Sequence, residues 1–136
     1  MAIEECTHEA LRSTLERGGS VCVVANGCPE NRIDAARMIE TFRRAGWAVT
    51  EDHTSADLIV FVSCGLTNVT ESFSMRVIGD LSRGKRPGAR VLVCGCLPRI
   101  NPARLGEVYD GVTFGSDDCD RLAELLGVAA EAGELE

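Results

Sequence analysis

Three cysteines, Cys28, Cys64 and Cys96, each follow closely after a short apolar stretch of the sequence. Thiolate sulfur is a soft ligand, and a set of thiolates selects iron–sulfur clusters or zinc over hard cations. One such cysteine would mean little, but three in one small domain indicate a shared ligand. Three thiolates satisfy three irons of a [4Fe-4S] cluster and leave the fourth iron open to a sulfur species, a substrate or a partner's ligand. The apolar stretches are residues 21–25, 57–62 and 91–94.

The elements that must position these cysteines alternate between strands and helices. Continuous apolar runs bounded by glycine or polar residues predict buried strands, and apolar residues at helical spacing predict the helices between them. The predicted strands are 21–25, 47–50, 57–62, 91–94 and 112–114, and the predicted helices are 4–17, 32–45, 67–83, 101–109 and one beginning after 117. This alternation predicts an α/β three-layer sandwich around a five-stranded, mainly parallel sheet, for which we favour the flavodoxin-like order 2-1-3-4-5.

Local signals set the expected helix limits and apolar sides. Asn31 is expected to cap the helix after the first strand, and Gly46 to end it. Ile33 belongs to the apolar side predicted for that helix, and Val69 and Phe73 to the side predicted for the helix after the third strand.

In a sheet of this order the strands before Cys28, Cys64 and Cys96 are neighbours. Their carboxyl ends share the edge at which open α/β sheets bind ligands. Neighbouring strands lie about 4.8 Å apart, so three strand ends span roughly 10 Å. Each cysteine has a glycine next to it in the sequence, as Gly95 is next to Cys96. A glycine lets the backbone approach a bulky inorganic core. Helix N-termini follow, and their positive ends favour thiolate over thiol. We therefore predict that these three cysteines share one metal centre.

The other cysteines have plainer explanations. Cys22 lies inside a predicted strand, where a buried thiol packs as a small hydrophobic side chain. Cys94 lies two residues before Cys96 but within its strand, and we interpret it as a packing residue too. Cys119, at the start of the last predicted helix, is the outside candidate for a fourth thiolate. The sequence contains no Cys-x-x-Cys motif, which excludes a zinc ribbon or a thioredoxin-like site.

Length and charge bound the class of protein. The 136 residues suit one domain, expected over 1–127, with a disordered acidic tail over 128–136. The net charge of −7 and the scarcity of aromatic residues disfavour a nucleic-acid surface. No apolar run approaches the roughly 20 residues that cross a bilayer, and the first residues lack the features of a signal peptide. We expect a cytoplasmic protein that binds neither membrane nor, by itself, nucleic acid.

Three motifs in order resemble the methylthiotransferase N-terminal domain family. Residues 26–34 look like its Gly-Cys-x-x-Asn-x-x-Asp motif, and 56–64 are similar to its second cysteine motif, with Val-Ser where the family usually has Asn-Thr. Residues 93–97 resemble the third motif, Val-x-Gly-Cys, and 114–115 match a Val-Gly pair that follows the fifth strand. The resemblance runs from about residue 20 to 126, nearly the whole chain.

This resemblance implies an auxiliary [4Fe-4S] cluster on Cys28, Cys64 and Cys96. In the family, the domain takes part in inserting sulfur, and then a methylthio group, into a C–H bond of tRNA or a ribosomal protein. The chain contains no Cys-x-x-x-Cys-x-x-Cys motif, by which radical S-adenosylmethionine enzymes hold their own cluster. We therefore expect a stand-alone component that supplies or carries sulfur, as sulfide, persulfide or methylthio, for a separate partner enzyme such as a radical S-adenosylmethionine protein.

Two other functions stay open at this point. The open iron could itself catalyse Lewis-acid or sulfur chemistry on a small molecule, which would make the chain an enzyme in its own right. Alternatively, the cluster could serve a non-catalytic electron-transfer or docking module. Simple electron carriers normally use four thiolates, which argues against that reading.

Overall fold

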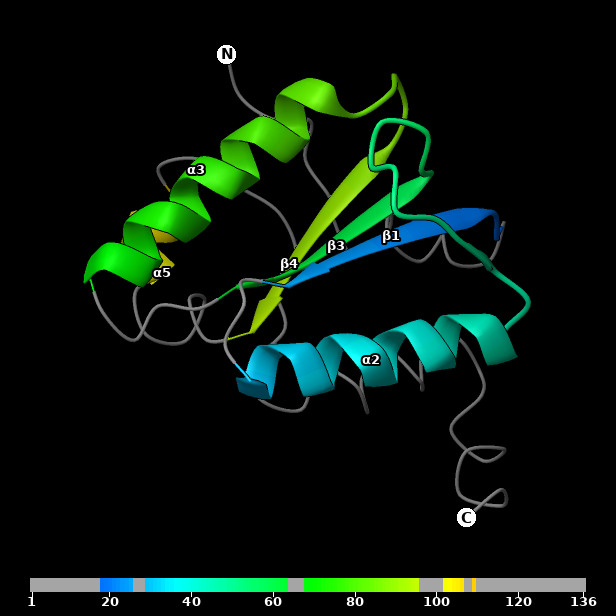
Figure 1. The fold of residues 1–136 in the computed structure, drawn as a ribbon. Helices are drawn as coiled ribbons and strands as arrows, with labels where there is room; N and C mark the ends of the chain where they lie inside the picture. Colours follow the sequence, from blue (N-terminus) through cyan, green and yellow to red (C-terminus); the bar gives the residue numbers. More distant parts are fainter. Residues whose placement is uncertain (1–17, 26–28, 64–67, 96–101, 107–108, 110–136) are drawn as a thin grey trace.

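The computed structural model describes residues 18–25, 29–63, 68–95, 102–106 and 109, and these form a helix–sheet–helix arrangement (Figure 1). In chain order the elements are β1 (Ser20–Ala25), α2 (Pro29–Arg44), β2 (Ala48–Val49), β3 (Leu58–Ser63), α3 (Asn68–Gly84), β4 (Arg90–Gly95) and α5 (Pro102–Leu105).

Among these residues the sheet has four parallel strands in the order β2-β1-β3-β4. The pairing of β1 with β3 ends at Ala25 opposite Val62, and the pairing of β3 with β4 ends at Ser63 opposite Gly95. The carboxyl ends of β1, β3 and β4 therefore lie level with one another. The predicted fifth strand falls on residues 112–114, outside the described part of the chain, so the five-stranded order remains a prediction.

The central strand β3 is buried along its whole length, which explains its continuous apolar sequence. Alternate side chains of the sheet pack on opposite faces. One face packs against α2, whose Met38 and Phe42 are fully buried, and the other packs against α3 through Ile78 and Leu81. Figure 1 shows the two helices on opposite sides of the sheet. Phe42 also meets Trp47 edge to face, with ring centroids 5.1 Å apart, at the turn after α2.

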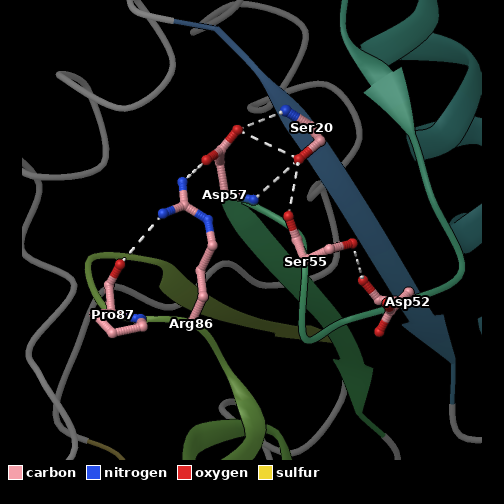
Figure 2. Close-up of polar contacts among 6 residues, drawn as sticks. All are labelled: Ser20, Asp52, Ser55, Asp57, Arg86 and Pro87. Atoms are coloured by element: carbon pink, nitrogen blue, oxygen red, sulfur yellow. Dashed lines mark hydrogen bonds and ion pairs between the residues drawn. The ribbon is translucent and has the colours of Figure 1, made fainter.

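A polar cluster ties the strands together at the amino edge of the sheet, opposite the predicted cysteine site (Figure 2). Asp57 accepts hydrogen bonds from the backbone N–H of Ser20 at 2.9 Å and from its hydroxyl at 3.3 Å. The same carboxylate forms an ion pair with Arg86 in the loop before β4. These contacts join the starts of β1 and β3 to that loop, and they account for Asp57 as a structural residue.

The structure corrects the predicted N-terminal cap of α2 and the predicted apolar sides of α2 and α3. Helix α2 begins at Pro29, so Asn31 lies within the helix and does not cap it. Proline suits a first helical position because its missing N–H has no intrahelical partner there. Ile33, Val69 and Phe73 are exposed, at 61%, 79% and 47%, instead of facing the core. All three lie on the sides of their helices opposite the buried residues, which are Ala35, Met38 and Phe42 in α2 and Glu71, Ser74, Ile78 and Leu81 in α3.

Other expectations hold or lie outside the described residues. Gly46 follows the end of α2 with a φ of +91°, as its predicted role as a helix stop requires. The predicted N-terminal helix, the last helix and the acidic tail over 128–136 are not among the described residues. No helix in the described ranges is long and apolar enough to cross a membrane.

Candidate functional site

The candidate site is the carboxyl edge of the sheet, where the last residues of three neighbouring strands meet. These residues are Ala25 in β1, Ser63 in β3 and Gly95 in β4. Ser63 and Gly95 are register partners, and Ala25 is opposite the residue before Ser63. Strand spacing places the three ends within roughly 10 Å of one another.

The ends of β3 and β4 are held together by a side chain as well as by the sheet. The hydroxyl of Ser63 donates a hydrogen bond of 2.5 Å to the backbone carbonyl of Cys94, and Ser63 is fully buried. Gly95 follows with a φ of +91°. A Cβ at Gly95 would overlap the carbonyl oxygen of Ser63 and lie 2.7 Å from its amide nitrogen. The two backbones approach so closely that only glycine fits.

This contact gives Gly95 a different function from the one expected. Its missing side chain was predicted to admit an inorganic core, but the atoms that occupy the space are the backbone of Ser63. The sequence signal that could have identified Ser63 is its place directly before Cys64, at a position where the family usually has another hydroxyl residue.

Both long helices begin at this same edge of the sheet. Helix α2 starts at Pro29, four residues after β1 ends, and α3 starts at Asn68, five residues after β3 ends. The N-terminus of a helix carries a partial positive charge, which stabilises anionic ligands and lowers the pKa of nearby thiols. Beside the start of α3, Val69, Ser72, Phe73 and Arg76 line a surface hollow of about 400 Å³.

The predicted ligands themselves, Cys28, Cys64 and Cys96, lie outside the described residues, as does Cys119. Within the described ranges no group of three or more His, Cys, Asp and Glu side chains could hold a metal ion. Two of these cysteines are nevertheless adjacent in the sequence to described strand ends. Cys64 directly follows Ser63, and Cys96 directly follows Gly95. In the sequence, these two cysteines therefore come directly after a register pair on adjacent strands.

The other two cysteines in the strands are buried and pack in the two cores. Cys22 is buried on the α3 side of the sheet and Cys94 on the α2 side. Burial raises the pKa of the Cys22 thiol, and the negative charges of Asp52 and Glu51 raise it further. Cys22 is buried in the core cluster beside α3, so the interpretation of Cys22 as a packing residue is confirmed.

The comparisons with known proteins decide the family. Residues 20–115, well over half of the chain, match the family described as Uncharacterized protein family UPF0004, which is the N-terminal domain of methylthiotransferases. The chain belongs to this family.

Curated proteins from several organisms are similar to this methylthiotransferase N-terminal domain. The ribosomal protein uS12 methylthiotransferase RimO of Sorangium cellulosum is 33% identical over 112 residues, covering 79% of this chain and 23% of the relative. RimO of Pelotomaculum thermopropionicum is 33% identical over 123 residues, covering 87% and 28%. A probable threonylcarbamoyladenosine tRNA methylthiotransferase of Pyrococcus abyssi is 30% identical over 109 residues, covering 80% and 25%.

The chain spans about a quarter of the length of these curated relatives. No solved structure matches it. The family assignment therefore covers this domain. It does not assign the activity of a whole methylthiotransferase to the chain.

The edge of the sheet suits an iron–sulfur cluster in three respects. The residues that follow the three strand ends in the sequence include three cysteines, and thiols are the donors that iron–sulfur clusters require. Two helices of at least 16 residues direct their positive ends to the edge, where a cluster with thiolate ligands adds negative charge. The strand ends of β3 and β4 are buried, which shields such a group from water on that side.

Proposed function

We propose that this domain binds a [4Fe-4S] cluster through Cys28, Cys64 and Cys96 and supplies or carries sulfur for C–S bond formation by a partner enzyme. Membership of the methylthiotransferase N-terminal domain family supports a sulfur-related function. The observation that carries the proposal is the level ending of β1, β3 and β4, each followed within three residues by one of these cysteines.

In this proposal the fold spaces the three thiolates, and the helices make them easier to ionise. The strand register brings three chain segments to one edge, so that the cysteines come from neighbouring backbones. The N-termini of α2 and α3 stabilise negative charge at this edge. A cluster held by three thiolates would present one iron without a protein ligand, at which a sulfur species or small molecule could bind.

The chemistry of C–H activation would come from the partner enzyme. The 136 residues contain no Cys-x-x-x-Cys-x-x-Cys motif for a radical S-adenosylmethionine cluster. In this proposal a radical S-adenosylmethionine centre outside these 136 residues would generate the substrate radical, and this domain would present sulfur to it. The net charge of −7 supports a protein or small-molecule partner in preference to nucleic acid.

Anaerobic reconstitution with iron and sulfide tests the proposal. The full chain should bind about four irons, and the separate replacements Cys28→Ala, Cys64→Ala and Cys96→Ala should each prevent stable cluster assembly. Cys22→Ala is the matched control, because it removes a buried thiol from the same sheet without touching the edge. A complete cluster in the Cys64→Ala protein would refute the ligand assignment.

Sulfur transfer is tested separately with cluster-loaded protein labelled with ³⁴S. Transfer of the label to product in the presence of a radical S-adenosylmethionine enzyme supports the proposal. Turnover of a small molecule without any partner would favour a catalytic cluster instead. Electron transfer with no label in the product would favour an electron carrier.

A further inference from the structure

One buried side chain links the backbone segments that lead into Cys64 and Cys96. Ser63 immediately precedes Cys64, and its hydroxyl donates to the carbonyl of Cys94, two residues before Cys96. The hydrogen bond is 2.5 Å long and is buried. It crosses from Ser63, in the last register pair of the two strands, to the residue before its register partner Gly95.

Gly95 is a second constraint on the same pair of strand ends. Its backbone has a φ of +91° and approaches Ser63 so closely that no side chain fits between them. The hydrogen bond of the Ser63 hydroxyl and the close backbone contact of Gly95 therefore both act where β3 and β4 end. Together they leave little freedom for β3 and β4 to separate or slide where the two cysteines begin.

Ser63 is also an unusual residue for its position. The rest of β3, Leu58 to Val62, is wholly apolar, and every residue of the strand is buried. A hydroxyl costs free energy to bury unless it forms a hydrogen bond. The bond to Cys94 provides that compensation, yet an apolar residue would need none. Packing alone therefore does not account for a polar residue at the end of this strand.

We propose that Ser63 is a positioning residue that sets the separation of Cys64 and Cys96 as ligands of one cluster. The inference rests on the proposed cluster-binding function. The hydroxyl acts through the carbonyl of Cys94 and has no contact with the cluster itself. Its loss leaves the three thiolates in place but loosens two of them, so the cluster still assembles and then dissociates more readily.

The test compares four reconstituted proteins: wild type, Ser63→Ala, Ser63→Thr and Ser63→Val. Threonine and valine have the same shape and both suit a strand, so this pair differs only in the hydroxyl. Iron content is measured first, followed by the rate at which a chelator removes iron and by the electron paramagnetic resonance spectrum of the reduced cluster. A net hydrogen bond of about 1 kcal/mol corresponds to about a fivefold change in the rate.

We expect Ser63→Ala and Ser63→Val to load about four irons, to lose them about fivefold faster than wild type and to give a broadened spectrum. Ser63→Thr should restore both the rate and the spectrum. Equal rates of iron loss from the threonine and valine variants would overturn the proposal.

Tyr109→Phe separates positioning from general stability. Tyr109 is buried and its hydroxyl donates to the carbonyl of Val91 at 2.9 Å, a bond of the same kind to the other end of β4. Its removal should lower the unfolding temperature while leaving iron loss unchanged. Faster iron loss in Tyr109→Phe, equal to that in Ser63→Val, would assign the effect to stability and refute the positioning role. Failure of the wild-type protein to bind iron would instead refute the cluster proposal.

Discussion

Replacing Gly95 by alanine should destabilise the protein far more than the loss of an ordinary glycine. Gly95 has a φ of +91°, a region that costs a residue with a side chain about 1–2 kcal/mol. The added Cβ would also overlap the carbonyl oxygen of Ser63, which belongs to the buried central strand and cannot move aside easily. Such overpacking costs about 1–3 kcal/mol.

The two costs together predict a loss of about 2–5 kcal/mol in the free energy of unfolding. A chain of 136 residues has a total stability of about 7–20 kcal/mol, so the variant should still fold. At about 4 °C for each kcal/mol, the midpoint of thermal unfolding should fall by about 8–20 °C.

Gly46→Ala provides a matched control. Gly46 has the same φ of +91°, but a Cβ there would meet nothing within 4 Å. Its replacement therefore incurs the cost of backbone conformation alone, about 1–2 kcal/mol. Thermal and urea unfolding of both variants, followed by circular dichroism, give the difference. If Gly95→Ala is no less stable than Gly46→Ala, the close contact between β3 and β4 does not exist in solution and the argument fails.

Two further predictions concern the rest of the sheet. Asp57→Ala should lower the free energy of unfolding in urea by about 1.5–3 kcal/mol, because the carboxylate accepts two hydrogen bonds from Ser20. Arg86→Ala should lower it by only about 0–1 kcal/mol, because the ion pair of Arg86 is partly exposed. Equal losses in the two variants would show that the ion pair dominates. The difference in the free energy of unfolding between wild type and Cys22→Ala should fall as the pH rises above about 8.5. Above that pH the thiol ionises in the unfolded chain, whereas its raised pKa keeps it neutral in the folded protein, so unfolding becomes more favourable. Urea titrations from pH 7 to 10 measure this difference, and a constant value would contradict the assigned environment of Cys22.

The fold was largely predictable because its signals are local. The apolar stretches of β1, β3 and β4 contain no charged residue in their interiors, and they alternate with helical spacing along the chain. Alternation of this kind leads to a parallel sheet with helices on both faces. The start of α2 was misplaced because Asn31 gives a strong capping signal, while Pro29 two residues earlier already has the φ that a helix needs.

The apolar sides of the helices were less predictable. Helical spacing alone groups Val69 and Phe73 with the core residues Ile78 and Leu81. Burial also depends on whether another element covers that part of the helix, and this is a tertiary property. In α3 the buried side consists of Glu71, Ser74, Ile78 and Leu81, so two polar residues lie on the buried side of the first turns and Val69 and Phe73 lie on the exposed side.

The sequence by itself determined which side chains can do chemistry at the site. Cys28, Cys64 and Cys96 are the residues of the right type directly after predicted strands, and their assignment as ligands remains a prediction. Only the tertiary structure decided that β3 and β4 end at a register pair closed by the Ser63 hydroxyl and the bare backbone of Gly95. Residues more than 30 positions apart form that contact, and their approach depends on strand order and register, which no local pattern in the chain encodes.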